Sequence, residues 1–225
     1  MEGREGFIIS VFNYCDRWCE TCPFTSRCRM FAHVTQDGRS GEWPRQDVPL
    51  APVKWLEDVL IEMNALAGVF LTGEELAACG PQLSAAHAEI YERAKAYCLW
   101  AHECVATLQV GRGADTSDPI SVIAWLSSLN ASKIRYALTG LAEFDGNREF
   151  PPDHEGAAKV ALLGIDRSCA AWQQLVGQRR LSAARARPCL EELAWLRGRL
   201  EAAIPEARRF VRPGFDEPEV VAGAR

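Results

Sequence analysis

Four cysteines lie close together near the start of the chain, as Cys15, Cys19, Cys22 and Cys28, with the spacing C-x3-C-x2-C-x5-C. Thiols crowded this closely oxidise or bind metal when they are left free. Cys19 and Cys22 can bind one centre from a single tight turn, and Cys28 can return to it after one more short turn. The spacing therefore predicts that these four cysteines are ligands of a metal ion or of a cluster.

Two kinds of centre suit four thiolates. Zinc binds four thiolates tetrahedrally at about 2.3 Å, and its structural sites are usually built from two separated C-x2-4-C pairs. A [4Fe–4S] cluster uses one thiolate per iron and tolerates uneven spacing. Because the four cysteines here form one compact run, the pattern favours a [4Fe–4S] cluster. Zinc is the alternative, and free or disulfide-forming thiols are the third.

The segment 19–28, Cys-Glu-Thr-Cys-Pro-Phe-Thr-Ser-Arg-Cys, resembles part of a known iron–sulfur loop. It is similar to the C-x2-C-P-x4-C segment of endonuclease III-type DNA glycosylases and to the cysteine-rich end of RecB-like iron–sulfur nucleases. The resemblance implies a [4Fe–4S] cluster and covers these ten residues only. In the glycosylases six residues separate the first ligand from the second, whereas three residues separate Cys15 from Cys19. Their catalytic residues have no counterpart here, so neither activity is implied.

Three arginines lie in or beside the cysteine run, namely Arg17, Arg27 and Arg29. They could contact a phosphate or an acidic partner, or they could compensate the charge of an anionic cluster on a solvated surface. The net charge of −5 argues against non-specific coating of nucleic acid. We therefore expect a protein partner rather than nucleic acid.

The bulk composition is that of a globular protein with no membrane segment. A chain of 225 residues is long enough to bury a sizeable core without a disulfide scaffold. No window contains the ~20 apolar residues of a transmembrane helix, and the N-terminus does not have the pattern of a secretory signal. Nine cysteines, an odd number, together with their clustering favour metal ligation in a reducing cytoplasm.

Hydrophobic residues recur at helical spacing over most of the remaining chain. No long stretch alternates with period two, so we predict an all-α fold: an antiparallel bundle of about five helices carrying a small N-terminal cysteine-rich module. The predicted units are the module over 1–46, the bundle over 47–212 and a flexible tail over 213–225. Helices are predicted over 52–70, 72–80, 84–108, 119–139, 153–175 and 188–210.

The bundle itself offers little further chemistry. The Glu-x-x-His motif of ferritin-like di-metal sites is absent from the sequence. If alternate helices run parallel, His87 and His154 begin two parallel helices and could form a pocket at one end, with Glu155 beside them. Capping and solvated charge are the alternative interpretation of these residues.

Three classes of function follow from the sequence. The first is a [4Fe–4S] protein in electron transfer, in redox or iron sensing, or as an accessory subunit. The second is a zinc-stabilised module that binds nucleic acid or protein through its arginines. The third is an enzyme with a pocket in the helical bundle. The cysteine run is the only constellation with specific chemistry, so we favour the first.

Overall fold

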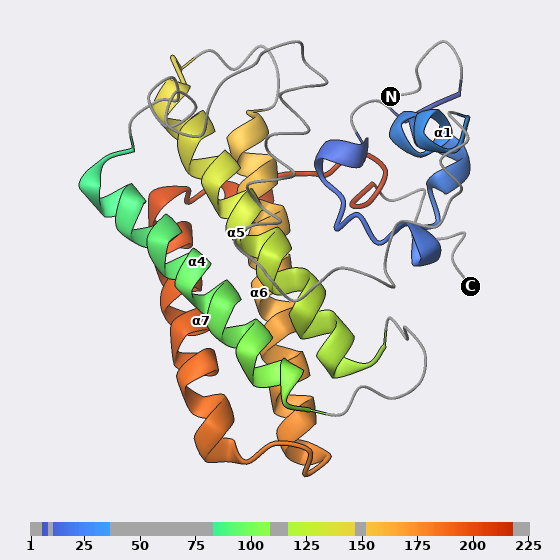
Figure 1. The fold of residues 1–225 in the computed structure, drawn as a ribbon. Helices are drawn as coiled ribbons and strands as arrows, with labels where there is room; N and C mark the ends of the chain where they lie inside the picture. The colour runs from blue at the N-terminus through green and yellow to red at the C-terminus, as the bar shows by residue number, and fades with distance from the viewer. Residues whose placement is uncertain (1–5, 9–10, 37–82, 109–116, 147–151, 218–225) are drawn as a thin grey trace, which may run out of the picture.

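The structure is all-α in the part of the chain that it describes. This computed structural model gives five α-helices and four short 3-10 turns there, and no β-strand among those residues. Figure 1 shows the long helices gathered into a bundle, with a small module at its side. The predicted fold class is therefore confirmed. The described residues are 6–8, 11–36, 83–108, 117–146 and 152–217.

Four long helices form the bundle: α4 (Ala85–Ala106), α5 (Pro119–Glu143), α6 (Asp153–Gly177) and α7 (Ala183–Ala203). They run alternately up and down, and α5 and α6 share the most extensive contact (Figure 1). Their inward faces are rich in alanine, leucine and isoleucine, which allow close packing without polar groups to satisfy. The largest fully buried side chains include Trp172, Tyr97, Ile123, Leu126, Ile134, Leu162, Leu175 and Leu193.

Small residues bring α6 close to its neighbours. A Cβ atom on Gly164 would lie 2.0 Å from Oδ1 of Asn130 on α5. One on Gly156 would lie 2.2 Å from the ring of Tyr14, which belongs to the N-terminal module. Neither distance is possible for a real side chain, so these two glycines permit the observed packing.

Two predicted helix ends are wrong. The last helix begins at Ala183 rather than near Pro188, because Ser182 accepts a hydrogen bond from the backbone N–H of Arg185 at 3.3 Å and so caps it earlier. It ends at Ala203 rather than near residue 210. A separate 3-10 turn, η4 (Ala207–Arg209), follows.

The helix predicted over 119–139 also ends later than expected, at Glu143. Gly140 therefore lies inside α5 and is not its cap. A Cβ atom there would lie 3.0 Å from Cβ of His154 on α6. The absence of a side chain at Gly140 allows α5 and α6 to approach each other closely.

The N-terminal module consists of short turns and one short helix. These elements are η1 (Val11–Asn13), η2 (Cys19–Thr21), η3 (Thr25–Arg27) and α1 (Arg29–Gln36). The module has a small apolar cluster of its own, formed by Ile8, Val11 and Phe24. Such a cluster is too small to fix the fold alone, so other contacts must hold the module in shape.

The chain after α7 returns to the module. Figure 1 shows it crossing from the end of α7 to the turns of the N-terminus. Phe215 packs edge-on against Phe24, with ring centroids 4.9 Å apart, and Arg212 forms an ion pair with Asp216 at 2.9 Å. Residues 213–217, predicted as part of a flexible tail, therefore pack on the module instead.

Several predictions fall outside the described residues. The predicted helices over 52–70 and 72–80, and the module boundary at 46, lie there, as do residues 218–225. Within the described residues, no helix is both long enough and apolar enough to cross a membrane.

Candidate metal centre

The four cysteines of the module line one hollow, which we call the cysteine hollow. It is small and partly open to solvent. Cys15, Cys19, Cys22 and Cys28 are all half-buried, and all carry free thiols. The structure thus brings together all four of the residues that the spacing selects.

Tight local turns produce this convergence. Arg17 adopts a left-handed backbone conformation, with φ of 55°, and reverses the chain between the first two cysteines. The backbone N–H of Cys22 donates to the carbonyl of Cys19 at 3.2 Å, closing η2. The N–H of Cys28 donates to the carbonyl of Thr25 at 3.3 Å, closing η3. Each turn returns the next thiol to the same side.

Backbone N–H groups also point at two of the sulfur atoms. Burial raises the pKa of both Cys15 and Cys22. The N–H groups of Arg17 and Phe24, each two residues after a cysteine, hydrogen-bond to these sulfurs and lower the two pKa values in part. Hydrogen bonds to sulfur stabilise thiolate ligands and tune the potential of iron–sulfur clusters.

Negative charge on the neighbouring cysteines makes the thiol of Cys19 harder to ionise. The pKa of Cys19 is raised to about 11, first by burial and then by the charges of Cys15, Cys22 and Cys28. Cys15, Cys19 and Cys22, whose pKa values are all raised, stay protonated near neutral pH unless a cation replaces their protons. Metal binding would therefore release protons from this site, as it does at other thiolate centres.

The sulfur atoms share the hollow but do not close around one point. Among the described residues, no group of three or more histidines, cysteines, aspartates or glutamates is arranged so that it could hold a metal ion. A tetrahedral zinc site requires all four sulfurs within about 2.3 Å of one ion. A cluster with one thiolate per iron keeps its thiolates farther apart.

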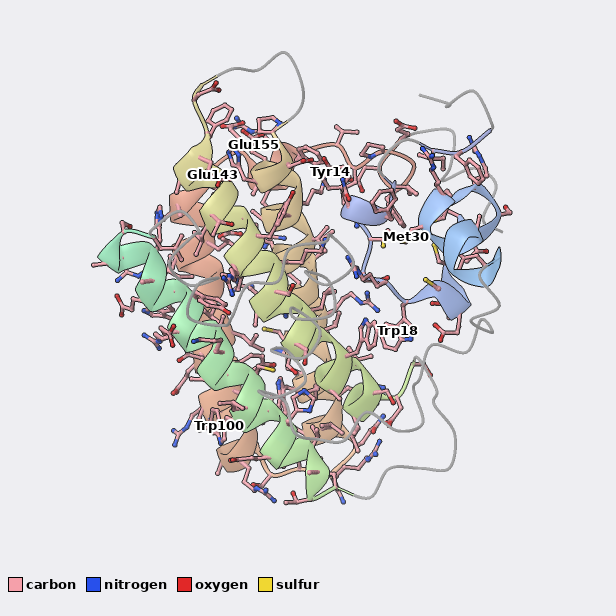
Figure 2. All side chains as sticks on the ribbon, turned by 45° about the horizontal axis from the view of Figure 1, so that its top comes forward. Tyr14, Trp18, Met30, Trp100, Glu143 and Glu155 are labelled. Carbon is pink, nitrogen blue, oxygen red and sulfur yellow. The ribbon has the colours of Figure 1, made fainter. Side chains whose placement is uncertain are left out.

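Aromatic rings form much of the wall. Trp18, Phe24, Phe31 and Phe215 all line the cysteine hollow, and Trp18 and Phe24 are buried. Trp18 lies between the module and the bundle (Figure 2), where its ring centroid is 6.1 Å from that of Trp125 on α5. These rings limit the access of water, which affects the potential of any cluster bound there.

The bundle fixes the loop that carries Cys15. Trp125 donates from Nε1 to the carbonyl of Asp16 at 2.8 Å, and Arg167 of α6 pairs with the Asp16 carboxylate at 2.6 Å. Lys133 of α5 donates from Nζ to the carbonyl of Asn13 at 2.5 Å. Polar contacts from two helices therefore position this loop.

A further contact joins the module to the start of α6. The hydroxyl of Tyr14 donates to the carboxylate of Asp153. Its ring packs on Phe210, with centroids 4.9 Å apart, and on Val160. The module, α6 and the C-terminal segment meet at this tyrosine.

The three predicted arginines have different surroundings. Arg17 and Arg29 are exposed. Arg27 is half-buried, and its Nε donates to the carbonyl of Gly6 at 3.4 Å. Arg17 is close enough to Cys15 to lower the pKa of that thiol. Arg27 thus supports the module itself, which leaves Arg17 and Arg29 as the exposed cations.

The described contacts do not join His87 to His154, the two histidines of the predicted bundle pocket. His154 and Glu155 are both buried, and the ring of His154 packs against Phe144, with centroids 4.9 Å apart. Both α4 and α6 pack on α5 and α7, so they face each other diagonally. The backbone N–H of His87 bonds to the Ser84 hydroxyl at the start of α4. A pocket shared by His87 and His154 stays a prediction.

Four residues around the hollow were missed by the sequence analysis: Trp125, Lys133, Arg167 and Phe215. Lys133 offered the clearest signal, because it is a lysine on a helix whose neighbours at helical spacing, Asn130 and Ala137, are buried. The others carry no such local signal.

The comparisons with known proteins add no relative. No protein-family model, no curated protein and no solved structure matches this chain.

Proposed function

We propose that the module binds a [4Fe–4S] cluster through Cys15, Cys19, Cys22 and Cys28. The protein would then act in electron transfer, in redox or iron sensing, or as an accessory subunit of a partner protein. The observation that carries this proposal is the convergence of all four free thiols on one hollow. Free clustered thiols also favour a reducing compartment, and we place the protein in the cytoplasm.

The donor set supports a cluster over a single zinc ion. Four thiolates with uneven spacing suit four irons, each of which needs one. All four cysteines line one hollow. Aromatic walls and N–H groups directed at Cys15 and Cys22 are the features that tune such a centre.

Four protein ligands would leave no open coordination position on the cluster. An open position is what a metal needs to bind and activate a substrate. The proposed role is therefore electron transfer, sensing or structure. Trp18 and Phe215 would exclude water, while Trp125 and Arg167 would hold the loop of Cys15 in place.

Elemental analysis tests this proposal. The full chain, purified without oxygen, should be brown, absorb broadly at the violet end of the visible spectrum and contain iron and acid-labile sulfide in equal amounts. Cys19→Ser should lose most of both. Cys98→Ser is the matched control, because Cys98 is buried in α4 away from the hollow. Colourless protein with one zinc per chain would contradict the proposal.

A zinc-stabilised binding module is the second candidate, and the exposure of Arg17 and Arg29 beside the hollow is the observation that favours it. It would show zinc in the same analysis and salt-dependent binding of an anionic partner. Binding should weaken in Arg17→Gln and Arg29→Gln. Unchanged binding in both variants would remove this candidate.

A further inference from the structure

Lys133 is a buried cation at the boundary between the bundle and the cysteine hollow. Only 9% of its surface is exposed. Its ammonium group donates to the carbonyl of Asn13 at 2.5 Å, two residues before Cys15. Within the described part of the chain, it forms no ion pair. A buried ammonium group usually has a carboxylate partner, because an unpaired buried charge is costly.

Both positive and negative groups near Lys133 affect its pKa. Burial and, after it, the nearby guanidinium of Arg17 lower the pKa of Lys133, which is about 8. Negative charge on Cys15 and on Asp153 has the opposite effect. Asp153 already accepts the hydroxyl of Tyr14. Besides Asp153, the cysteine hollow is the second source of negative charge near Lys133.

A metal centre with four thiolates supplies such a charge. Zinc with four thiolates carries a net charge of −2, and a [4Fe–4S] core with four thiolates is also anionic. A buried cation next to one ligand would stabilise either centre by Coulombic attraction in a medium of low dielectric constant.

We propose that Lys133 is a positioning residue whose positive charge stabilises the metal–thiolate centre of the cysteine hollow. The inference rests on the proposed function only in requiring that the four cysteines bind a metal. It does not depend on whether that metal is a cluster or zinc. The hydrogen bond to the carbonyl of Asn13 holds the ammonium group of Lys133 beside the loop that carries Cys15.

Lys159 provides a close comparison. It too donates from Nζ to a backbone carbonyl at 2.5 Å, that of Phe210. Unlike Lys133, it forms an ion pair with Asp216, at 2.8 Å. Both lysines thus tether a packed segment to the bundle, and only Lys133 lacks a carboxylate partner. Lys159→Met is therefore a matched control.

The experiment measures retention of the metal by the full chain. Wild-type protein, Lys133→Met, Lys133→Arg and Lys159→Met are loaded without oxygen and challenged with excess chelator. We expect Lys133→Met to lose metal about 10- to 100-fold faster than wild type, the range typical of residues that support metal ligands. Lys133→Arg and Lys159→Met should stay within a few-fold of wild type. Circular dichroism checks that each variant retains its helices.

Two results would overturn the inference. One is a Lys133→Met variant that retains metal as well as wild type. The other is a Lys133→Arg variant that loses metal as fast as Lys133→Met, because the role would then lie in the shape of the side chain. If Lys133→Met does not fold, Lys133→Gln takes its place, since it is neutral and keeps a hydrogen-bond donor. Metal retention like that of wild type in Lys133→Gln would overturn the inference equally.

The reduction potential gives a second measurement if the protein holds a cluster. Removing a positive charge destabilises the reduced, more negative form, so the potential of Lys133→Met should fall. A tenfold change in the relative stability of the two forms corresponds to about 59 mV for one electron. Wild-type protein that binds no metal would defeat the proposed function. Metal-bound wild-type protein whose potential and metal retention are unaffected by Lys133→Met would defeat this inference alone.

Discussion

The module and the bundle are stabilised in different ways. The bundle buries a continuous core along four long helices, with Trp172, Leu193 and many others inaccessible to solvent. The module has an apolar cluster of only a few residues and surrounds a hollow lined by four thiols. The bundle thus has its own source of stability. The module depends on contacts with the bundle and the C-terminal segment and, under the proposal, on its metal.

Metal removal should give the largest difference between the two regions. Binding free energies at structural thiolate sites are about 10–16 kcal/mol, and this energy is lost when the metal leaves. In Cys19→Ser or in chelated protein, we expect amide hydrogens of residues 11–36 to lose protection from exchange, while those of α5 and α6 keep it. Exchange measured by mass spectrometry checks this. Loss of protection throughout the bundle would show that the two regions are not independent.

A cavity in the bundle core should destabilise the bundle and leave the metal content of the module unchanged. Trp172 is fully buried, and its Nε1 donates to the hydroxyl of Tyr97 at 3.1 Å. Trp172→Ala should lower the free energy of unfolding by about 3–5 kcal/mol, as measured by denaturant titration. The metal content of the folded protein should stay at the wild-type level. A selective loss of metal would contradict the comparison.

Removing the aromatic ring of Phe215, which the C-terminal segment contributes to the wall of the hollow, should have a smaller effect. Phe215 packs on Phe24 and lines the cysteine hollow. An aromatic pair of this kind contributes about 0.5–1.5 kcal/mol beyond the burial of its area. Phe215→Ala should leave metal content unchanged after anaerobic loading but speed the loss of metal in air. Val211→Ala is the control, because Val211 is 59% exposed. Equal rates in both variants would exclude a shielding role.

The smallest expected effect concerns acid stability. Burial raises the pKa of Asp216, but its pairs with Arg212 and Lys159 outweigh burial and hold that pKa well below its usual range. Since the folded-state pKa lies below the unfolded value of about 3.9, the stabilisation is present above pH 4 and is lost as pH falls below it. The group is partly exposed, so solvent screening limits the effect to about 1 kcal/mol or less.

Asp216→Asn should remove this acid-dependent part of the stability. Thermal unfolding of both proteins between pH 6 and pH 3 measures it. Wild type should lose its advantage over the variant as the pH falls. Parallel curves over this range would show that Asp216 does not contribute.

Local patterns were enough to predict the helical fold and to select four cysteines that the structure places around one hollow. Apolar residues at helical spacing predicted α4, α5 and α6 to within a few residues at most ends. The predicted start of α7 was wrong because proline favours the first helical position, whereas Ser182 provides a hydrogen-bonding cap six residues before Pro188. Proline is tolerated within the first two turns here, so the cap decided the boundary.

The residues that surround the four cysteines could not be predicted from local patterns. Lys133 and Arg167 reach the loop of Cys15 from helices more than a hundred residues away in sequence. Phe215 reaches the same hollow from the other end of the chain. Residues 213–217 were predicted as part of a flexible tail, since the polar and turn-forming character of that segment gives no indication that Phe215 packs on Phe24.

The sequence by itself determined that the described chain is helical and that four cysteines lie close enough in sequence to line one hollow. Both properties depend on residues a few positions apart, whose geometry follows from backbone hydrogen bonding and tight turns. Only the tertiary structure decided which cations, rings and carbonyl groups surround those cysteines. That arrangement depends on how the helices pack over long distances in sequence, and no local spacing records it.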